Sequence, residues 1–233
     1  MPSPRQSALS RFDELAEAYE DWFRTRLGSL VDRREKELIL SLVRPRPGQT
    51  VLEVGSGTGH FLHEIASRGA RCVGLEPSSE MLAVAMSRDQ HGGIDYVRGR
   101  GESLPFKQGA FDCLLYMTTL EFVQDVDAAI QEARRVLRPG GRLVCGVLNA
   151  EGPWARARKR EAGLWGEARF FRAPELRALL APLGPISLEY CVHVPPGLGW
   201  LPAPVLSLAD WLLGRLLPGS GALIGVEVIL EGT

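Results

Sequence analysis

One stretch decides the fold of this chain: Thr50-Val-Leu-Glu-Val-Gly-Ser-Gly-Thr-Gly-His-Phe61. Apolar residues of strand type come first, three glycines then punctuate a turn, and the apolar residues that follow recur at helical spacing. Glycine has no Cβ and tolerates positive φ, so the backbone of such a turn can approach a ligand closely, and the next helix begins with unpaired N–H groups. The stretch therefore predicts a strand, a ligand-binding turn and a helix.

The glycine spacing and one acid distinguish this turn from a dinucleotide-binding turn. The dinucleotide fingerprint is G-x-G-x-x-G, whereas Gly55, Gly57 and Gly59 give G-x-G-x-G. Glu53 ends the strand two residues before the first glycine, where its carboxylate would repel a pyrophosphate and attract an ammonium group. The turn therefore favours a ligand with a cationic end.

Residues 51–59 resemble the first motif of the class I S-adenosylmethionine-dependent methyltransferases, in the type 11-like group that acts on small molecules. The resemblance implies that Glu53 and the glycine turn, with Ser56, hold the methionine part of S-adenosylmethionine. It also implies methyl transfer by in-line displacement from a sulfonium. For that reaction the protein mainly aligns the nucleophile and excludes water, and it requires no metal.

A second acid stands where a ribose is expected. Residues 71–75 predict a strand that ends at Glu76, about 20 residues after the turn, where an acid accepts hydrogen bonds from two ribose hydroxyls. The alternative is a solvent-facing acid that caps the next helix, a role that Ser78 fits better. By the resemblance, the cofactor site extends to Pro77 and to Met81, which would pack on the adenine.

The adenine contacts depart from the family pattern at one position. Residues 94–97 predict a third strand, and Gly99–Phe106 follow it. Family members usually have an aspartate where this chain has Arg100, then a small residue and an acid, which Gly101 and Glu102 match. Either Glu102 or backbone carbonyls must therefore accept the hydrogen bonds of the adenine amino group.

Strand and helix patterns alternate throughout residues 50–147, which predicts a Rossmann-like, doubly wound parallel sheet with its ligand at the carboxyl ends of the strands. Met117 and Glu121 lie at such an end. The sequence of Arg135–Gly141 is similar to the family's usual sequence before the fifth strand. Strands at 186–194 and 222–230 would complete the family's seven-stranded sheet, in which the last strand is antiparallel.

We expect one methyltransferase domain over residues 1–233, with a helical cap at 1–47, a cofactor-binding core at 48–148, and substrate-side elements with the last two strands at 149–233. The pattern from Phe12 to Tyr19 is similar to the family's N-terminal segment that closes over the cofactor.

Core packing is the alternative role for Tyr19 and for Trp22 in the predicted helix at 9–23. Leu38, Ile39 and Leu42 predict a second helix before the first strand.

Two later segments lie outside the resemblance. Residues 154–160 predict a basic loop, for which a solvated charge run is favoured over a site for an acidic substrate. The insertion at 195–221, between the last two strands, carries a helical stripe of apolar residues: Leu201, Val205, Leu208, Leu212 and Leu216. We expect the stripe to fold back on the core. A lid over an apolar substrate, a homodimer face and membrane-surface contact through 198–217 stay open.

A catalytic base is needed only if the acceptor loses a proton near neutral pH. The candidates are Glu121, Tyr19 and His193. The alternatives are a solvent-exposed acid at a helix start for Glu121 and packing on a strand for His193. His60 follows the last glycine and is expected on the helix surface rather than at the cofactor.

The net charge, the cysteine positions and the apolar runs argue against several classes of protein and of site. The net charge of −1 disfavours a general nucleic-acid-binding surface. The four cysteines lie far apart on strand-like runs, which predicts buried free thiols rather than disulfides or a metal site. No run of about 18 uncharged apolar residues occurs, so we expect a cytoplasmic protein without a membrane span.

Three functional hypotheses follow. The first is an S-adenosylmethionine-dependent methyltransferase acting on a small, partly apolar molecule. The second is a non-catalytic protein that binds the same cofactor as a regulator or partner subunit. The third, a nicotinamide-dependent dehydrogenase, is disfavoured by the glycine spacing and by Glu53.

Overall fold

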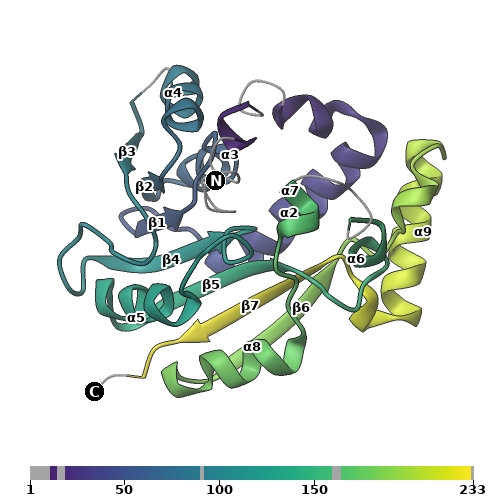
Figure 1. The fold of residues 1–233 in the computed structure, drawn as a ribbon. Helices are drawn as coiled ribbons and strands as arrows, with labels where there is room; N and C mark the ends of the chain where they lie inside the picture. Colours follow the sequence, from purple (N-terminus) through teal and green to yellow (C-terminus); the bar gives the residue numbers. More distant parts are fainter. Residues whose placement is uncertain (1–10, 15–18, 90–91, 159–163, 232–233) are drawn as a thin grey trace, which may run out of the picture.

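The computed structural model describes residues 11–14, 19–89, 92–158 and 164–231. In this part of the chain seven strands form one sheet in the order β3-β2-β1-β4-β5-β7-β6 (Figure 1). The strands are β1 (Thr50–Val54), β2 (Arg71–Glu76), β3 (Ile94–Arg98), β4 (Phe111–Met117), β5 (Leu137–Leu148), β6 (Ile186–Cys191) and β7 (Leu223–Ile229). β1 to β5 pair in parallel, and β7 runs antiparallel to both β5 and β6. The predicted fold is confirmed.

Helices cover both faces of the sheet. α2 (Arg26–Val43) and α3 (His60–Ala66) pack on one face, and α5 (Val126–Val136) and α8 (Ala173–Leu180) pack on the other (Figure 1). Successive residues of β4 alternate between the two cores, with Leu115 in one and Leu114 in the other. This double burial explains why the strands read as continuous apolar runs.

Helix starts coincide with polar residues that cap them. Thr25, Ser78 and Asp125 accept hydrogen bonds from backbone N–H groups at the starts of α2, α4 (Ser79–Arg88) and α5. Such caps satisfy N–H groups that have no partner within the helix. The cap of α4 matters most for function, because it fixes the chain just after Glu76.

Apart from α9 (Ala203–Leu216), the remaining elements are short. They are η1 (Tyr19–Arg24), α6 (Pro153–Arg158), α7 (Leu164–Glu167), η2 (Ala181–Leu183), η3 (Pro196–Leu198) and η4 (Pro218–Ser220), and residues 11–14 are also helical. All four cysteines are buried on strands as free thiols, as predicted. Among the described residues, no helix has the length and apolar character needed to cross a bilayer.

The expected basic loop at 154–160 is wrong at residues 154–158, which belong to α6. Trp154 is buried, and its indole Nε1 donates a hydrogen bond of 2.8 Å to the carbonyl of Val194. The guanidinium of Arg158 lies 5.4 Å from the ring centroid of Trp154 and 3.9 Å from that of Trp165. Part of this charge run is therefore packed against aromatic rings rather than simply solvated.

β6 ends earlier than predicted. Val192 has a φ of 60°, in the left-handed region that β-branched residues rarely adopt, and this turns the chain away from the strand. His193 and Val194 therefore lie outside the sheet. Their backbone N–H groups donate to Asp210 in the insertion instead.

Most of the apolar stripe of the insertion does not fold back on the core. Leu201 precedes α9 (Ala203–Leu216) and packs, partly buried, against the cluster of Leu206. The buried residues of α9 itself are Leu206 and Asp210, while Val205, Leu208, Leu212 and Leu216 are exposed. The expected burial is wrong because the ion pair of Asp210 with Arg34 of α2 turns the opposite side of the helix inward.

Candidate functional site

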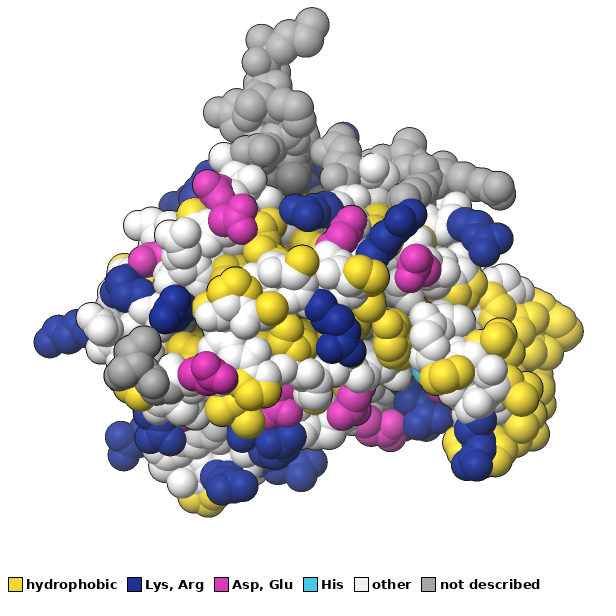
Figure 2. All heavy atoms as spheres, turned by 90° about the horizontal axis from the view of Figure 1, so that it is seen from below, with side chains coloured by type: hydrophobic (Ala, Val, Ile, Leu, Met, Phe, Trp, Pro, Cys, Tyr) yellow, Lys and Arg dark blue, Asp and Glu magenta, His cyan; other side chains and the backbone are white. Residues whose placement is uncertain are grey.

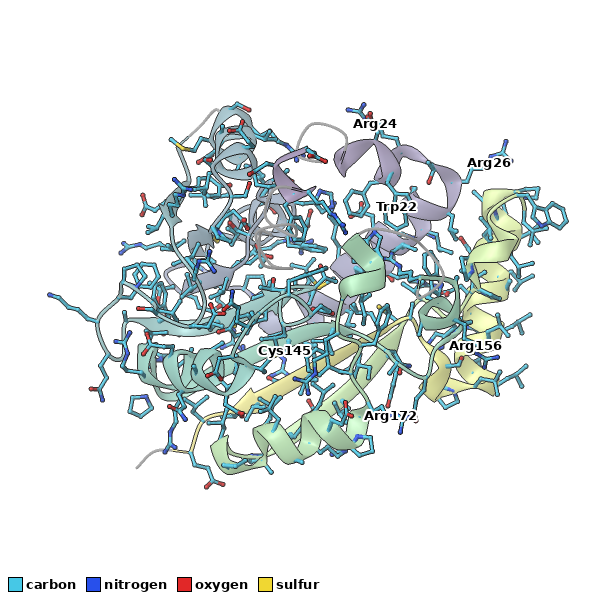
Figure 3. The ribbon with its side chains drawn as sticks, in the orientation of Figure 1. Trp22, Arg24, Arg26, Cys145, Arg156 and Arg172 are labelled. Atoms are coloured by element: carbon cyan, nitrogen blue, oxygen red, sulfur yellow. The ribbon has the colours of Figure 1, made fainter. Side chains whose placement is uncertain are left out.

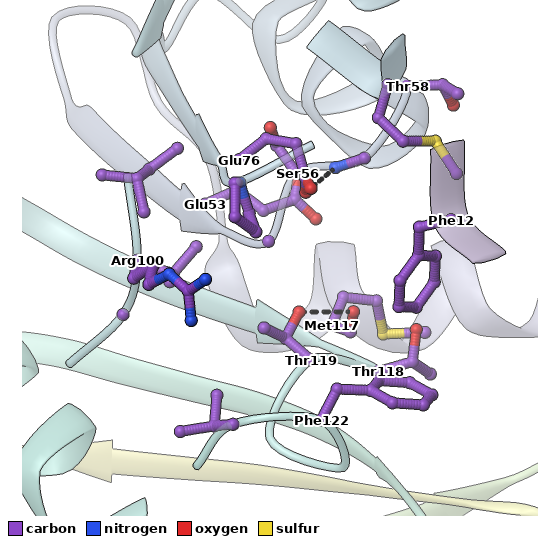
Figure 4. A pocket seen from close by; sticks show the side chains of 18 of the residues that line it. Phe12, Glu53, Ser56, Thr58, Glu76, Arg100, Met117, Thr118, Thr119 and Phe122 are labelled. Carbon is purple, nitrogen blue, oxygen red and sulfur yellow. Dashed lines mark hydrogen bonds between the residues drawn. The ribbon is translucent and has the colours of Figure 1, made fainter. Parts of the chain in front are cut away.

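A pocket lies at the carboxyl ends of β1, β2 and β4, where β1 has one neighbour on each side and the order of the strands reverses (Figure 4). Its volume is about 1080 Å³ with its open mouth included. Every residue predicted to bind the cofactor lines it except Gly59: Glu53, Gly55, Ser56, Gly57, Glu76, Pro77, Met81, Gly101, Glu102 and Met117.

The three glycines of the turn have different roles. All adopt positive φ, at 73° for Gly55, 52° for Gly57 and 76° for Gly59. A Cβ on Gly59 would strike the hydroxyl of Tyr96, so this glycine closes the turn without facing the pocket. A Cβ on Gly57 would meet no atom within 4 Å, because its Cα faces open space. Gly57 therefore leaves room for a ligand against the backbone.

Glu76 is buried and tied to the turn. Its Oε2 accepts a hydrogen bond from the N–H of Gly57 and its Oε1 accepts one from the N–H of Ser78, each at 2.9 Å. Burial raises the pKa of Glu76, the two backbone N–H groups lower it, and the nearby carboxylate of Asp13 raises it. The predicted helix-capping role of Ser78 is confirmed, since its Oγ accepts the N–H of Met81.

Glu53 lacks such support. Its side chain is 1% exposed, and among the described residues its Oε2 has no hydrogen-bond partner. Burial, and then the carboxylate of Glu76, raises the pKa of Glu53 well above its ordinary value. A buried acid without a partner is costly unless a cation or donor reaches it. The Oε2 of Glu53, without a partner, fits the ammonium group of S-adenosylmethionine, and the open space at Gly57 fits its methionine chain.

At the adenine side, Arg100, Gly101 and Glu102 all line the pocket. The Oε1 of Glu102 accepts a hydrogen bond of 2.9 Å from the N–H of Gln124, so this carboxylate also fastens the loop after β4. Arg100 lies where the family pattern has an acid. The role of Glu102 toward adenine stays a prediction.

The N-terminal segment reaches the pocket from above the sheet edge. Phe12 lines the pocket, and its ring meets that of Phe122 edge to face, with centroids 5.1 Å apart. Asp13 accepts a hydrogen bond from Ser78 Oγ. Residues 11–14 are thus fastened to both sides of the pocket. Tyr19 begins η1, but its side chain lies outside the described residues.

The end of the pocket near Phe12 is aromatic and apolar, and sequence reasoning missed most of it. Met117 and Phe122 lie there, and Thr118 follows Met117 with a φ of 46° (Figure 4). Phe61 and Val123 also line the pocket. These side chains come from the end of β4, from the loop after it and from α3. Their only signal in the sequence was the position of that loop at a strand's carboxyl end.

His60 is not on the helix surface, contrary to expectation. Its side chain is 11% exposed, and its Nε2 lies 2.6 Å from Asp32 Oδ1 on α2. The ring stacks on Phe23 with centroids 4.4 Å apart. Burial acts to raise the pKa of Asp32, but hydrogen bonds from His60 and Lys36 hold it below its ordinary value. His60 is therefore a fixed part of the pocket wall.

Glu121 is not the exposed helix-start acid that was the alternative to catalysis. Its side chain is 4% exposed, and its Oε1 accepts a hydrogen bond of 2.6 Å from the N–H of Leu148. Burial raises the pKa of Glu121 to about 7, against the effect of that N–H. The side chain does not line the pocket, although that of Phe122 does. Its catalytic role stays a prediction.

His193 is not among the residues that line the pocket. It follows β6 rather than lying on a strand, and its ring occupies the space where a Cβ on Gly214 of α9 would be. Its ring therefore packs beside α9, not on a strand as the alternative had it.

Comparisons with known proteins agree with this geometry. Residues 52–145 match the family model described as a methyltransferase domain. An uncharacterized protein of Methanocaldococcus jannaschii is 34% identical over 76% of this chain and 81% of its own length. Demethylmenaquinone methyltransferase of Mycobacterium marinum is 38% identical over 60% of this chain and 58% of its own.

A solved structure shares the fold. The S-adenosylmethionine-dependent methyltransferase of Thermotoga maritima, described as a possible histamine N-methyltransferase, has a TM-score of 0.74 over 94% of this chain and 98% of its own, at 24% identity. Sequence relationship, sheet order and pocket thus lead to one conclusion. The chain belongs to the methyltransferase domain family and is an S-adenosylmethionine-dependent methyltransferase.

Proposed function

We propose that this enzyme methylates a small, partly apolar acceptor that occupies the aromatic end of its pocket. The observation that carries the proposal is the contrast between the two ends. Glu53 and Glu76 lie at one end, whereas Phe12, Met117 and Phe122 lie at the other (Figure 4). Apolar side chains bind the apolar part of a ligand by removing it from water.

The acidic end of the pocket makes two proposed contacts with the cofactor. Glu53 binds the amino group of the methionine part, and Glu76 binds the ribose hydroxyls through lone pairs that Gly57 and Ser78 do not use. Gly55 and Ser56 hold the backbone turn against β2, because their N–H groups both donate to the carbonyl of Leu75. Met81 and Gly101 provide the flat walls for adenine.

When bound, S-adenosylmethionine supplies an electrophilic methyl group together with its leaving group. The residues of this chain then have two tasks, which are to align the acceptor and to exclude water. The edge-to-face pair of Phe12 and Phe122 closes the pocket with apolar surface. The named activity of the M. marinum relative, on demethylmenaquinone, supports an acceptor that combines a ring with apolar surface.

For an acceptor that must lose a proton, we propose Glu121 or Tyr19 as the base. Glu121 does not itself line the pocket, but it directly precedes Phe122, which does. Support for Glu121 is its pKa of about 7 and its Oε2, which has no hydrogen-bond partner among the described residues. A base must be deprotonated, so kcat should rise with pH to a plateau above about 7. The rise should vanish in Glu121→Gln while cofactor affinity is kept. A rise that persists in Glu121→Gln but vanishes in Tyr19→Phe would assign the role to Tyr19.

The function is tested by measuring release of S-adenosylhomocysteine with a panel of phenols, quinols and amines of graded apolar area. We expect turnover with ring-containing acceptors and none with small, fully polar amines. Phe122→Ala should raise KM for the apolar acceptors, whereas Lys107→Ala, on an exposed loop, should not. Binding of S-adenosylhomocysteine without turnover of any acceptor would instead favour a non-catalytic cofactor-binding protein.

A further inference from the structure

Helix α9 packs with its acid toward the protein and its apolar side toward solvent. Its only acid, Asp210, is 3% exposed, whereas most of its large apolar residues face solvent. Asp210 Oδ2 pairs with Arg34 Nε at 2.8 Å, and Oδ1 accepts the N–H groups of His193 and Val194 at 2.6 and 3.1 Å. Leu206 packs with Leu30 and Val194 beneath the helix. These contacts fix the helix with its apolar side outward.

The outward side forms a continuous apolar face at one edge of the molecule (Figure 2). Seven large side chains contribute, each between 44% and 74% exposed: Trp200, Val205, Leu208, Trp211, Leu212, Leu216 and Leu217. Soluble monomers rarely expose contiguous apolar patches of more than a few hundred Å². No part of the chain that the structure describes buries this face.

We propose that this face docks on a lipid surface whose head groups are anionic, with α9 lying in the plane of the interface. Helices that bind membranes in this way place leucine and tryptophan among the acyl chains and arginine among the head groups. Trp200 precedes α9 and Trp211 lies in its second half, both on the exposed side. Indole rings favour this boundary because one part is apolar and the N–H is polar.

The charges around the face support an anionic lipid as the occupant. Arg215 is the only exposed charge on α9 itself. On α2, Arg33 donates to Ser207 of α9 at 2.9 Å, and Arg26 lies on the same side of the molecule as α9 (Figure 3). The neighbouring acids Asp210 and Glu37 both pair with Arg34, and Asp210 is buried beneath the helix. Arginines therefore border the apolar face at both ends.

The same charges disfavour a second copy of this chain as the occupant. In a two-fold symmetric pair, each patch meets itself. Antiparallel α9 helices would bring Arg215 of one copy toward Arg26 and Arg33 of the other, and parallel helices would bring Arg215 to Arg215. Like charges would meet in either arrangement, which costs binding energy. Anionic head groups would complement both ends at once.

Cosedimentation of the full chain with vesicles tests the proposal. We expect binding to phosphatidylcholine vesicles that contain phosphatidylglycerol, weaker binding to phosphatidylcholine alone, and weakening by salt. The double variant Leu208→Glu/Leu212→Glu should reduce partitioning by at least about tenfold. Removal of Arg26, Arg33 or Arg215 should each reduce it roughly fivefold. Met86→Glu is the control, because Met86 is 63% exposed on α4, far from α9.

Three results would overturn the proposal. They are no binding to any vesicle, equal binding by the double variant and the wild type, and a wild-type dimer that the double variant makes monomeric in light scattering. If the double variant fails to fold, fluorescence of the wild type gives a second reading. The proposal expects a blue shift and quenching by brominated lipid, both lost in Trp211→Leu/Trp200→Leu, and an unchanged spectrum would contradict it. None of these readings depends on which acceptor is methylated.

Discussion

Two of the buried acids of this molecule, Asp210 and Glu53, have different surroundings. Under α9, Asp210 accepts two backbone N–H groups and pairs with Arg34. At the end of β1, Glu53 is equally buried, but among the described residues its Oε2 has no hydrogen-bond partner. A buried polar group is paired in most native proteins, so an unpaired one needs an explanation. The comparison indicates that Asp210 stabilises the fold, whereas Glu53 is held for a ligand.

The largest expected effect follows from removing the paired acid. Asp210→Ala would leave two buried N–H groups without their acceptor and Arg34 without this partner. We expect the free energy of unfolding to fall by about 3–5 kcal/mol. Urea denaturation measures this loss. Affinity for S-adenosylhomocysteine, measured by calorimetry on the fraction that stays folded, should match the wild type.

Removing the unpaired acid should weaken cofactor binding and leave stability intact, the reverse of the effect at Asp210. Glu53→Gln would remove a charge contact of roughly 1.5–3 kcal/mol, so affinity for S-adenosylhomocysteine should fall about ten- to a hundredfold or more. Stability should stay level or rise, because a neutral amide is easier to bury than a carboxylate. Glu80→Gln, an exposed acid on α4, is the control. A large loss of stability in Glu53→Gln would contradict the view that Glu53 is held for a ligand and not for the fold.

Two glycines extend the same contrast between packed and open positions. A Cβ at Gly59 would strike Tyr96, whereas one at Gly57 would meet only open space, although both glycines have positive φ. Gly59→Ala should therefore cost about 1–2 kcal/mol more stability than Gly57→Ala, by overpacking. Gly57→Ala should mainly weaken cofactor binding. Thermal unfolding with and without S-adenosylhomocysteine separates the two effects.

The smallest effect is a dependence on pH. Burial and Glu76 raise the pKa of Glu53 in the free protein, and a bound ammonium group would favour its charged form. Binding should release a proton, so affinity should rise with pH up to the raised pKa and then level off. The slope is at most about tenfold per pH unit. Calorimetry in buffers of different ionisation enthalpy detects the proton, and Glu53→Gln should abolish the release.

The cofactor half of the site could be predicted because its signals are local. Gly55, Gly57, Glu53 and Glu76 each stand at a strand end that the sequence pattern marks, and the parallel sheet brings those ends together. His60 could not be placed in the same way. Its burial depends on Asp32 and Phe23, which come from an earlier segment and contact it only in the folded chain.

The insertion shows a different limit of sequence reasoning. Periodicity identified the residues that share one side of α9, but it does not say whether that side faces inward. The deciding residue was Asp210, on the opposite side, whose partners Arg34, His193 and Val194 are remote or irregular in the sequence. An acid on the polar side of a helix usually faces solvent, so the pattern alone favoured the wrong orientation.

A crystal structure with bound S-adenosylhomocysteine tests the central claim most directly. We predict that the amino group of the ligand lies at hydrogen-bond distance, about 2.7–3.2 Å, from Glu53 Oε2, with the ribose hydroxyls on Glu76. A ligand bound elsewhere, or one that leaves Glu53 Oε2 still without a partner, would contradict the assignment of that bare oxygen to the cofactor.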